Sequence, residues 1–85
     1  MLYVYVLRSN VDGKFYVGQT DDLKKRVSEH NAGQVPSTRR RIPLELLYYE
    51  ACNHRKDAVH REKYLKTTYG HRYLRNRLKH SLLQP

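Results

Sequence analysis

Tyr16 and Arg26 lie on either side of a predicted turn from a strand into a helix. The strand half is rich in aromatic and β-branched residues, and Gly18 lies at the corner, where the lack of a side chain lets other groups come close. A phenol and a guanidinium brought together at such a corner are able to bind or attack a phosphate group. The same two residue types are also common on surfaces without a function, so other residues of the chain are needed to distinguish a phosphate site from an ordinary surface.

Glu62 is the next candidate, because it interrupts an apolar helix face formed by Ala58, Val59 and Leu65. A carboxylate on such a face is costly to bury unless it is paired with a cation or binds a metal. Two interpretations stay open at this point. Glu62 either forms an ion pair with an arginine such as Arg26, or it binds one divalent cation, Mg²⁺ by preference, whose shell is completed by water and substrate phosphate.

The elements that must position these residues begin with a hairpin. A continuous apolar run over residues 2–7 predicts a strand inside a sheet, and the Asp-Gly pair at residues 12–13 predicts the turn that follows it. If the loop contains two or four residues, alternation places four residues on one face, Tyr3, Tyr5, Tyr16 and Gly18. Four others then line the opposite face: Val4, Val6, Phe15 and Val17.

A helix is expected over about residues 21–31. Thr20 is its predicted N-cap, the two aspartates that follow it suit the positive end of the helix, and Gly33 suits a left-handed C-terminal cap. Arg26 and His30 are four residues apart and are therefore neighbours on this helix.

The second half of the chain predicts one more strand and two more helices. The strand covers about residues 44–51, and Asn53 is the predicted cap of a helix over about residues 54–67. Gly70 is expected to end that region, and a third helix is expected over residues 71–83, with leucines along one side.

The charge is strongly positive. Seventeen Lys and Arg against eight Asp and Glu give a net charge of +9 on 85 residues, which suits a nucleic-acid partner. The residues expected to contact the nucleic acid fall in three groups: Lys24 and Lys25, then Arg39, Arg40 and Arg41, then Arg72 and Arg75. A single cysteine, the lack of a long apolar run and the lack of a signal-like start predict one cytoplasmic domain over residues 1–85 and no membrane partner.

The spacing of these residues resembles that of the GIY-YIG nuclease domain. The matching parts are Tyr3-Val4-Tyr5, then Tyr16-Val17-Gly18, then Arg26, His30 and finally Glu62. The resemblance covers residues 2 to about 78 and is closest to the small stand-alone members of the family. It implies an α+β fold in which a three-stranded antiparallel sheet is flanked by helices, in agreement with the order of elements above.

The resemblance also implies an activity, the hydrolysis of a DNA phosphodiester bond with one Mg²⁺ or Mn²⁺ ion. By position, Tyr16 acts as general base or orients the attacking water, with Tyr5 beside it and His30 assisting. Arg26 stabilises charge on the phosphate, and Glu62 holds the metal. Asn76 is the candidate for a late asparagine of the family. The expected substrates are branched or damaged DNA in repair or recombination.

Two departures from the family pattern keep other functions open. The first triplet is Tyr3-Val4-Tyr5, so Tyr3 and Val4 replace the glycine and isoleucine of the family name, although Tyr5 keeps the functional position. Gln19 stands where some repair-type members carry a lysine that lowers the pKa of the tyrosine, and a phenol needs such help at neutral pH. The alternative is therefore a basic nucleic-acid-binding module without catalysis. A third hypothesis is a small interaction protein whose basic loop binds protein or RNA.

Overall fold

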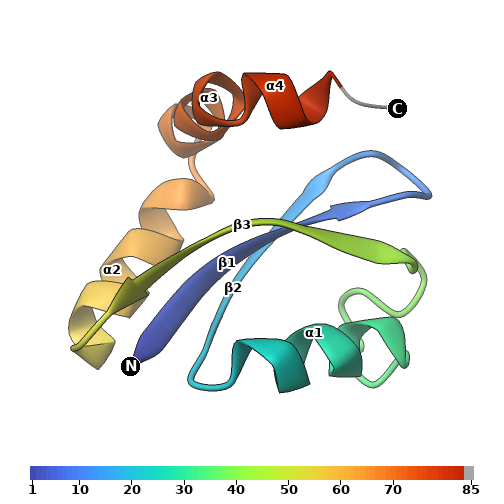
Figure 1. The fold of residues 1–85 in the computed structure, drawn as a ribbon, viewed down its shortest axis with the longest axis horizontal. Coiled ribbons are helices and arrows are strands. Elements are labelled where there is room, and N and C mark those ends of the chain that lie inside the picture. The colour runs from blue at the N-terminus through green and yellow to red at the C-terminus, as the bar shows by residue number, and fades with distance from the viewer. Residues whose placement is uncertain (84–85) are drawn as a thin grey trace.

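The computed structural model describes residues 1–83 and consists of one sheet with helices on both faces (Figure 1). The strands are β1 (Leu2–Ser9), β2 (Phe15–Thr20) and β3 (Leu44–Cys52), and the helices are α1 (Leu23–Asn31), α2 (Arg55–Leu65), α3 (Thr68–Arg77) and α4 (Lys79–Leu82). All strand pairs are antiparallel, in the order β2-β1-β3. The predicted three-stranded antiparallel sheet flanked by helices is confirmed.

The hairpin has the register that the alternation predicts. Tyr5 pairs with Gly18 and Leu7 pairs with Tyr16, so these residues share one face of the sheet. Ser9 donates a backbone hydrogen bond to the carbonyl of Lys14 at 3.1 Å, which closes a four-residue loop. The even-numbered side chains of β1 therefore point to the opposite face.

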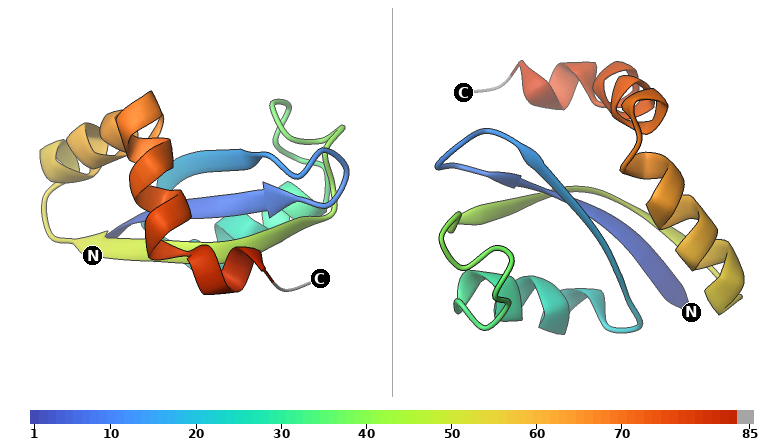
Figure 2. Two further views of the ribbon diagram at one scale, coloured as in Figure 1. Left: turned by 90° about the horizontal axis from the view of Figure 1, so that it is seen from above. Right: turned by 180° about the vertical axis from the view of Figure 1, so that it is seen from behind.

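Two apolar clusters cover the two faces (Figure 2). One face packs on α2, α3 and α4, and its buried residues are Val4, Val6, Val17, Ala58, Leu65, Leu74 and Leu78. The other face packs on α1 and the loop that precedes β3, around buried Tyr5, Leu7 and Leu44. β2 forms one edge of the sheet. On one face α2 packs against β1 and β2, and on the opposite face α1 lies against β3.

Two helices begin one or two residues later than predicted, because the strands before them are longer. The N-cap of α1 is Asp22, which accepts a hydrogen bond from the amide of Lys25 at 3.1 Å, and not Thr20. Thr20 ends β2, and its hydroxyl accepts a hydrogen bond from the Asp22 amide at 3.1 Å. The N-cap of α2 is His54 instead of Asn53, because β3 continues to Cys52.

Gly70 does not end a helix, so this prediction is wrong. It lies in the first turn of α3, which Thr67 caps by accepting a hydrogen bond from the Gly70 amide. A Cβ at Gly70 would lie 2.5 Å from the Cα of Leu65, so α3 crosses the end of α2 at a distance that only glycine allows. The single helix predicted over residues 71–83 is two helices, which meet at Leu78.

None of the helices within residues 1–83 is long and apolar enough to cross a membrane.

Candidate active site

Tyr5 lies across Gly18, and this contact explains the glycine at the corner. A Cβ on Gly18 would lie 2.5 Å from the hydroxyl oxygen of Tyr5 and 2.6 Å from the ring carbon that carries it. No real Cβ makes such contacts, so the side chain of Tyr5 reaches toward the β2 edge only because Gly18 has none. The pairing of β1 with β2 thereby places the Tyr5 phenol beside Tyr16, with ring centroids 6.4 Å apart.

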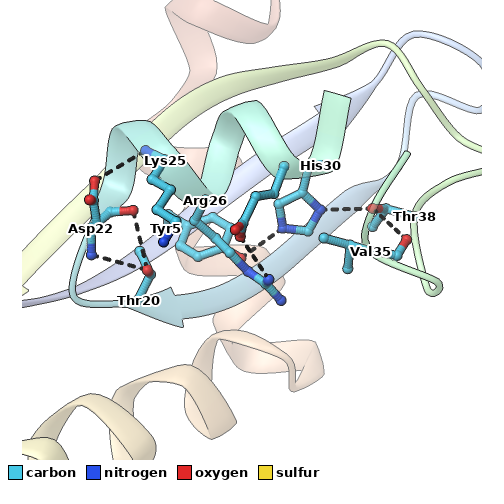
Figure 3. Close-up of polar contacts among 9 residues, drawn as sticks. Tyr5, Thr20, Asp22, Lys25, Arg26, His30, Val35 and Thr38 are labelled. Atoms are coloured by element: carbon cyan, nitrogen blue, oxygen red, sulfur yellow. Dashed lines mark hydrogen bonds and ion pairs between the residues drawn. The ribbon is translucent and has the colours of Figure 1, made fainter. Parts of the chain in front are cut away.

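His30 binds the Tyr5 hydroxyl (Figure 3). Its Nε2 lies 2.8 Å from the hydroxyl oxygen, and its Nδ1 lies 2.7 Å from the hydroxyl of Thr38. The sequence led us to expect that His30 assists Tyr16. The two rings do meet, edge to face with centroids 4.9 Å apart, but the hydrogen bond of His30 goes to Tyr5.

Burial keeps both partners of this hydrogen bond neutral. The pKa of Tyr5 is raised above its usual value mainly by burial, with the charges of Tyr16 and Glu62 acting in the same direction and the Arg26 guanidinium opposing them. The pKa of His30 is lowered to about 4 by burial and by the charge of Arg26, while Glu29 opposes this shift. At neutral pH the site therefore holds an un-ionised phenol next to an uncharged imidazole.

Arg26 places a guanidinium beside these rings. Its side chain extends from α1 across the ribbon of β2, and its Nη1 donates to a carboxylate oxygen of Glu29 at 3.2 Å, one helical turn away (Figure 3). Interactions with Tyr5 and Glu29 raise the pKa of Arg26, so it stays positively charged. One helix therefore supplies both the fixed charge and the imidazole of the site.

Glu62 approaches from α2, on the other side of the edge strand. One of its oxygens accepts a hydrogen bond from the side-chain amide of Gln19 at 3.0 Å, and the other lies 2.9 Å from the Lys66 ammonium. The carboxylate side chain is 18% exposed, so Glu62 is largely covered on the side of α2 that faces β2. Of the two interpretations, the ion pair is therefore present, but its cation is Lys66 of the same helix and not an arginine; Arg26 pairs with Glu29 on α1.

The oxygens at this position suit a hard cation better than a transition metal. Glu62 offers one half-buried carboxylate, and the side-chain oxygen of Gln19 is buried without a hydrogen-bond partner in the described part of the chain. Residues 1–83 contain no group of three or more His, Cys, Asp or Glu side chains that could hold a metal by themselves. Mg²⁺ is commonly bound by one or two carboxylates and completed by water and substrate phosphate, so these residues fit such an ion.

The predicted nucleic-acid contacts do not form one continuous patch. Lys24 and Lys25 are exposed on α1, and Arg39 and Arg40 are exposed on the loop that follows it. Arg41 differs from its neighbours because its guanidinium donates to the Asp12 carboxylate at 2.9 Å and to the carbonyl of Lys14 at 3.0 Å. It therefore ties this loop to the β1–β2 hairpin.

The third predicted group lies on α3. Arg72 and Arg75 line a groove of about 450 Å³ together with Lys66, Thr67, Thr68 and His71. Lys66 connects this groove to Glu62 through their ion pair. Asn76 is exposed on α3, and no hydrogen bond in the described part of the chain joins it to Tyr16, Arg26 or Glu62.

Two contacts of this arrangement were not predicted from the sequence, which singled out Gln19 only for the lysine that it replaces and did not single out Thr38. The register places Gln19 opposite Val4, on the face that packs against α2, so a polar residue among apolar ones was a signal that it meets Glu62. Thr38 had no such signal, because only the path of the loop between α1 and β3 brings it to His30.

The class of this protein follows from its fold and its candidate site. The site combines two tyrosines, an arginine and a glutamate around the edge strand of a three-stranded sheet. The family model of the GIY-YIG catalytic domain matches residues 1–78, and the chain belongs to this family.

Within the family, the chain is similar to UPF0213 proteins. It is 45% identical over 71 residues to a UPF0213 protein of Lacticaseibacillus paracasei, which covers 82% of this chain and 79% of that protein. It is 43% identical over 65 residues to one from Streptococcus agalactiae, covering 75% of this chain and 73% of that protein. The solution NMR structure of a UPF0213 protein from Bacillus halodurans has 31% identity and a TM-score of 0.54, covering 87% of this chain and 82% of that one.

Proposed function

We propose that this protein is a metal-dependent endonuclease that hydrolyses phosphodiester bonds in DNA, with branched or damaged DNA in repair or recombination as the expected substrate. The observation that carries the proposal is the arrangement around β2. Tyr5, Tyr16 and Arg26 lie on one side of this edge strand, and Glu62 lies on the other, close enough for its charge to raise the pKa of Tyr5. A phosphate bound at this edge would be contacted by the tyrosines and the arginine from one side and by the glutamate, or a cation bound to it, from the other.

Tyr16 is the residue assigned to the attacking water. Unlike the buried Tyr5, Tyr16 is partly exposed, which favours it over Tyr5 for contact with water. In the reaction the water oxygen forms a bond to phosphorus and the bond to the leaving oxygen breaks. As a base, Tyr16 takes one proton of the water on its phenolate oxygen; if Tyr16 only orients the water, this proton passes to solvent. The leaving oxygen takes up a proton from solvent.

Arg26 and Glu62 are assigned to the charge that develops on the phosphate. The Arg26 guanidinium is a fork-shaped donor that suits two phosphate oxygens, and its pKa shift keeps it cationic. Glu62, with Gln19 beside it, would hold the divalent cation. When bound, such a cation neutralises charge on the phosphate and on the leaving oxygen.

The path of the DNA follows the exposed basic residues on both sides of this edge. The groove on α3 leads away from Glu62 by way of Lys66, and it is lined by basic, hydroxyl and histidine side chains only. Lys24, Lys25, Arg39 and Arg40 are the candidates for phosphate contacts on the α1 side. Contacts of this kind fix the position of the duplex but do not read its sequence, so shape decides where cleavage occurs.

The test is a cleavage assay with supercoiled, linear, single-stranded and branched DNA in Mg²⁺, in Mn²⁺ and in chelator. We expect metal-dependent nicking that falls at least about 100-fold in Tyr16→Phe and in Glu62→Ala. Matched controls are Tyr69→Phe and Glu45→Ala, because both residues are exposed and the polar partner of Glu45 is Arg8, which is not a residue of the site. The proposal is wrong if the two site variants cut DNA as fast as the parent.

One observation favours a second function, a basic nucleic-acid-binding module without catalysis. Gln19 donates a hydrogen bond to Glu62 but brings no positive charge toward the tyrosines, which some repair-type family members supply with a lysine. This alternative predicts salt-dependent DNA binding that needs no metal and persists in Glu62→Ala. Binding without cleavage of any of the DNA forms would favour it.

A further inference from the structure

A chain of three buried polar side chains leads from β1 into the loop before β3. Tyr5 is 1% exposed, and His30 and Thr38 are fully buried. The two hydrogen bonds between them are short, 2.8 Å from Tyr5 to His30 and 2.7 Å from His30 to Thr38 (Figure 3). Buried polar groups of this kind are costly when one of them lacks a partner, so the direction of each bond matters.

The neighbours at the two ends decide where the protons lie. The Thr38 hydroxyl donates in a long hydrogen bond of 3.5 Å to the carbonyl oxygen of Val35, which can only accept and also receives the amides of Thr38 and Arg39 at 3.0 Å. At the other end, His30 is the one hydrogen-bond partner of the Tyr5 hydroxyl within residues 1–83, and the Arg26 guanidinium, whose interaction lowers the pKa of Tyr5, can only donate. One arrangement gives every proton an acceptor. Thr38 donates to Val35, His30 donates from Nδ1 to Thr38, and Tyr5 donates to Nε2 of His30.

The opposite arrangement leaves a proton without a partner. If Thr38 donated to Nδ1, His30 would carry its proton on Nε2 and donate to Tyr5. The Tyr5 oxygen would then receive the proton of His30, and its own hydroxyl proton would have no acceptor among the hydrogen bonds of residues 1–83. An unsatisfied buried donor of this kind disfavours this second arrangement.

We propose that Thr38 is a positioning residue of the candidate site, which holds His30 in the Nδ1–H tautomer and thereby fixes the Tyr5 hydroxyl as a donor to His30. Tyr5 then remains a neutral phenol with its oxygen lone pairs toward Arg26. The base or water-orienting role is left to Tyr16, and Tyr5 keeps Arg26 in place for the phosphate. The catalytic consequence rests on the proposed function, whereas the tautomer does not.

The tautomer is measured directly by long-range ¹⁵N–¹H correlation NMR of the His30 ring in the full chain at pH 7. We expect a protonated Nδ1 and an unprotonated Nε2 in the parent. Thr38→Val removes the acceptor of Nδ1–H, so the proton should move toward Nε2. Thr38→Ser restores the hydroxyl and should restore the parent spectrum. Ser37→Ala, an exposed neighbour in the same loop, is the control and should leave it unchanged.

Two results would overturn the proposal. One is a parent protein with the His30 proton on Nε2, a result that needs no variant and so stands even if Thr38→Val fails to fold. The other is a folded Thr38→Val protein whose tautomer is the same as that of the parent.

A cleavage assay separates this proposal from the proposed function. With an active parent, we expect Thr38→Val to lower kcat by about tenfold with little change in KM, and Thr38→Ser to recover most of the activity. A parent that binds DNA without cutting it contradicts the proposed function, and the NMR result still decides the role of Thr38. An unchanged kcat in Thr38→Val with a changed tautomer shows that Thr38 does not position the site for catalysis and overturns that part of the proposal.

Discussion

At the scale of single residues, His30 couples the candidate site to the stability of the fold. It is fully buried and uncharged, and its pKa of about 4 in the folded protein lies below the value of 6.5 that it has when unfolded. Between these two pH values the unfolded chain binds more protons than the folded one. The free energy of unfolding therefore rises with pH across this window and falls as the pH drops through it.

This difference predicts an acid-sensitive fold. Lowering the pH from 6.5 to 4 should remove at most about 3 kcal/mol of stability through His30 alone, because one pKa unit corresponds to about 1.4 kcal/mol. Denaturant unfolding at several pH values measures this. The slope of the free energy of unfolding against pH should be smaller in His30→Gln. It should be unchanged in His60→Gln, which replaces an exposed histidine on α2. Equal slopes in the parent and His30→Gln would contradict the account.

Lys66 is a second residue that leads to a prediction, which concerns the binding of a metal to Glu62. Its ammonium lies 2.9 Å from a Glu62 oxygen, so it occupies a position that competes with a cation bound to the same carboxylate. The Lys66 side chain is 54% exposed and is free to move away.

Removing this competitor should make the metal bind more tightly. In Lys66→Met we expect the Mg²⁺ concentration for half-maximal binding, measured by calorimetry without DNA, to fall severalfold, since an exposed ion pair of this kind contributes about 1 kcal/mol or less. Lys63→Met is the matched control, because Lys63 is exposed on the same helix. An unchanged or weaker Mg²⁺ affinity in Lys66→Met would show that Glu62 is not where the cation binds.

At the scale of elements, two glycines each allow a close contact, one in the candidate site and one between two helices. Gly18 makes room for the far end of the Tyr5 side chain, whereas Gly70 makes room for the backbone of α2. A side chain is able to shift when a Cβ is added, but the backbone of a packed helix is not, so the two positions should respond differently to alanine.

We expect Gly70→Ala to lower the melting temperature more than Gly18→Ala does. Gly18→Ala should lower the free energy of unfolding by about 1–3 kcal/mol. It should also displace Tyr5 from His30, so that the folded variant cleaves DNA more slowly than the parent. Thermal unfolding and the cleavage rate of the two variants measure both effects. A Gly18→Ala protein with the activity of the parent would show that the hydrogen bond between Tyr5 and His30 is not needed.

The sequence predicted the elements well where side-chain alternation decides the structure. The register of β1 and β2 follows from odd and even positions, so the shared face of Tyr5, Tyr16 and Gly18 was predicted correctly. The exact helix starts were missed because Thr20 and Asn53 are as good caps as Asp22 and His54, and strand length decides between them. Gly70 was misassigned because close packing and helix termination both favour glycine.

The candidate site was predictable only in part. The spacing of Tyr16, Arg26 and Glu62 singled these residues out, and the structure places them around one edge strand. Their hydrogen-bond partners depend on tertiary contacts that local patterns do not contain. Thr38 and Gln19 are examples, because each meets its partner only where a loop or a strand packs against a helix, whereas Lys66 lies four residues after Glu62 on the same helix.

At the scale of the whole molecule, the net charge of +9 predicts a strong dependence of DNA binding on salt. The three arginines in the loop before β3 should not contribute equally. Arg39 and Arg40 are exposed, whereas Arg41 is held by Asp12 and by a backbone carbonyl of the hairpin.

Replacing Arg39 or Arg40 with alanine should weaken DNA binding and reduce the slope of log affinity against log salt by about 1 for each phosphate that the variant no longer neutralises. Arg41→Ala is the comparison, and it should leave the salt slope nearly unchanged while lowering the stability of the hairpin. Fluorescence anisotropy with one duplex at several salt concentrations measures the slopes. A larger change in slope for Arg41→Ala than for Arg39→Ala would contradict this assignment.

The central claim is that the side chains around β2 hydrolyse a phosphodiester bond with the help of a cation held by Glu62. The most direct test is the single-turnover rate of DNA nicking in Mg²⁺ by the parent and by Glu62→Gln, which keeps the size of the side chain and its contact with Gln19. The account predicts nicking by the parent that chelator abolishes, and a rate at least about 100-fold lower in Glu62→Gln. Equal rates in the two proteins, or nicking that persists in chelator, would contradict it.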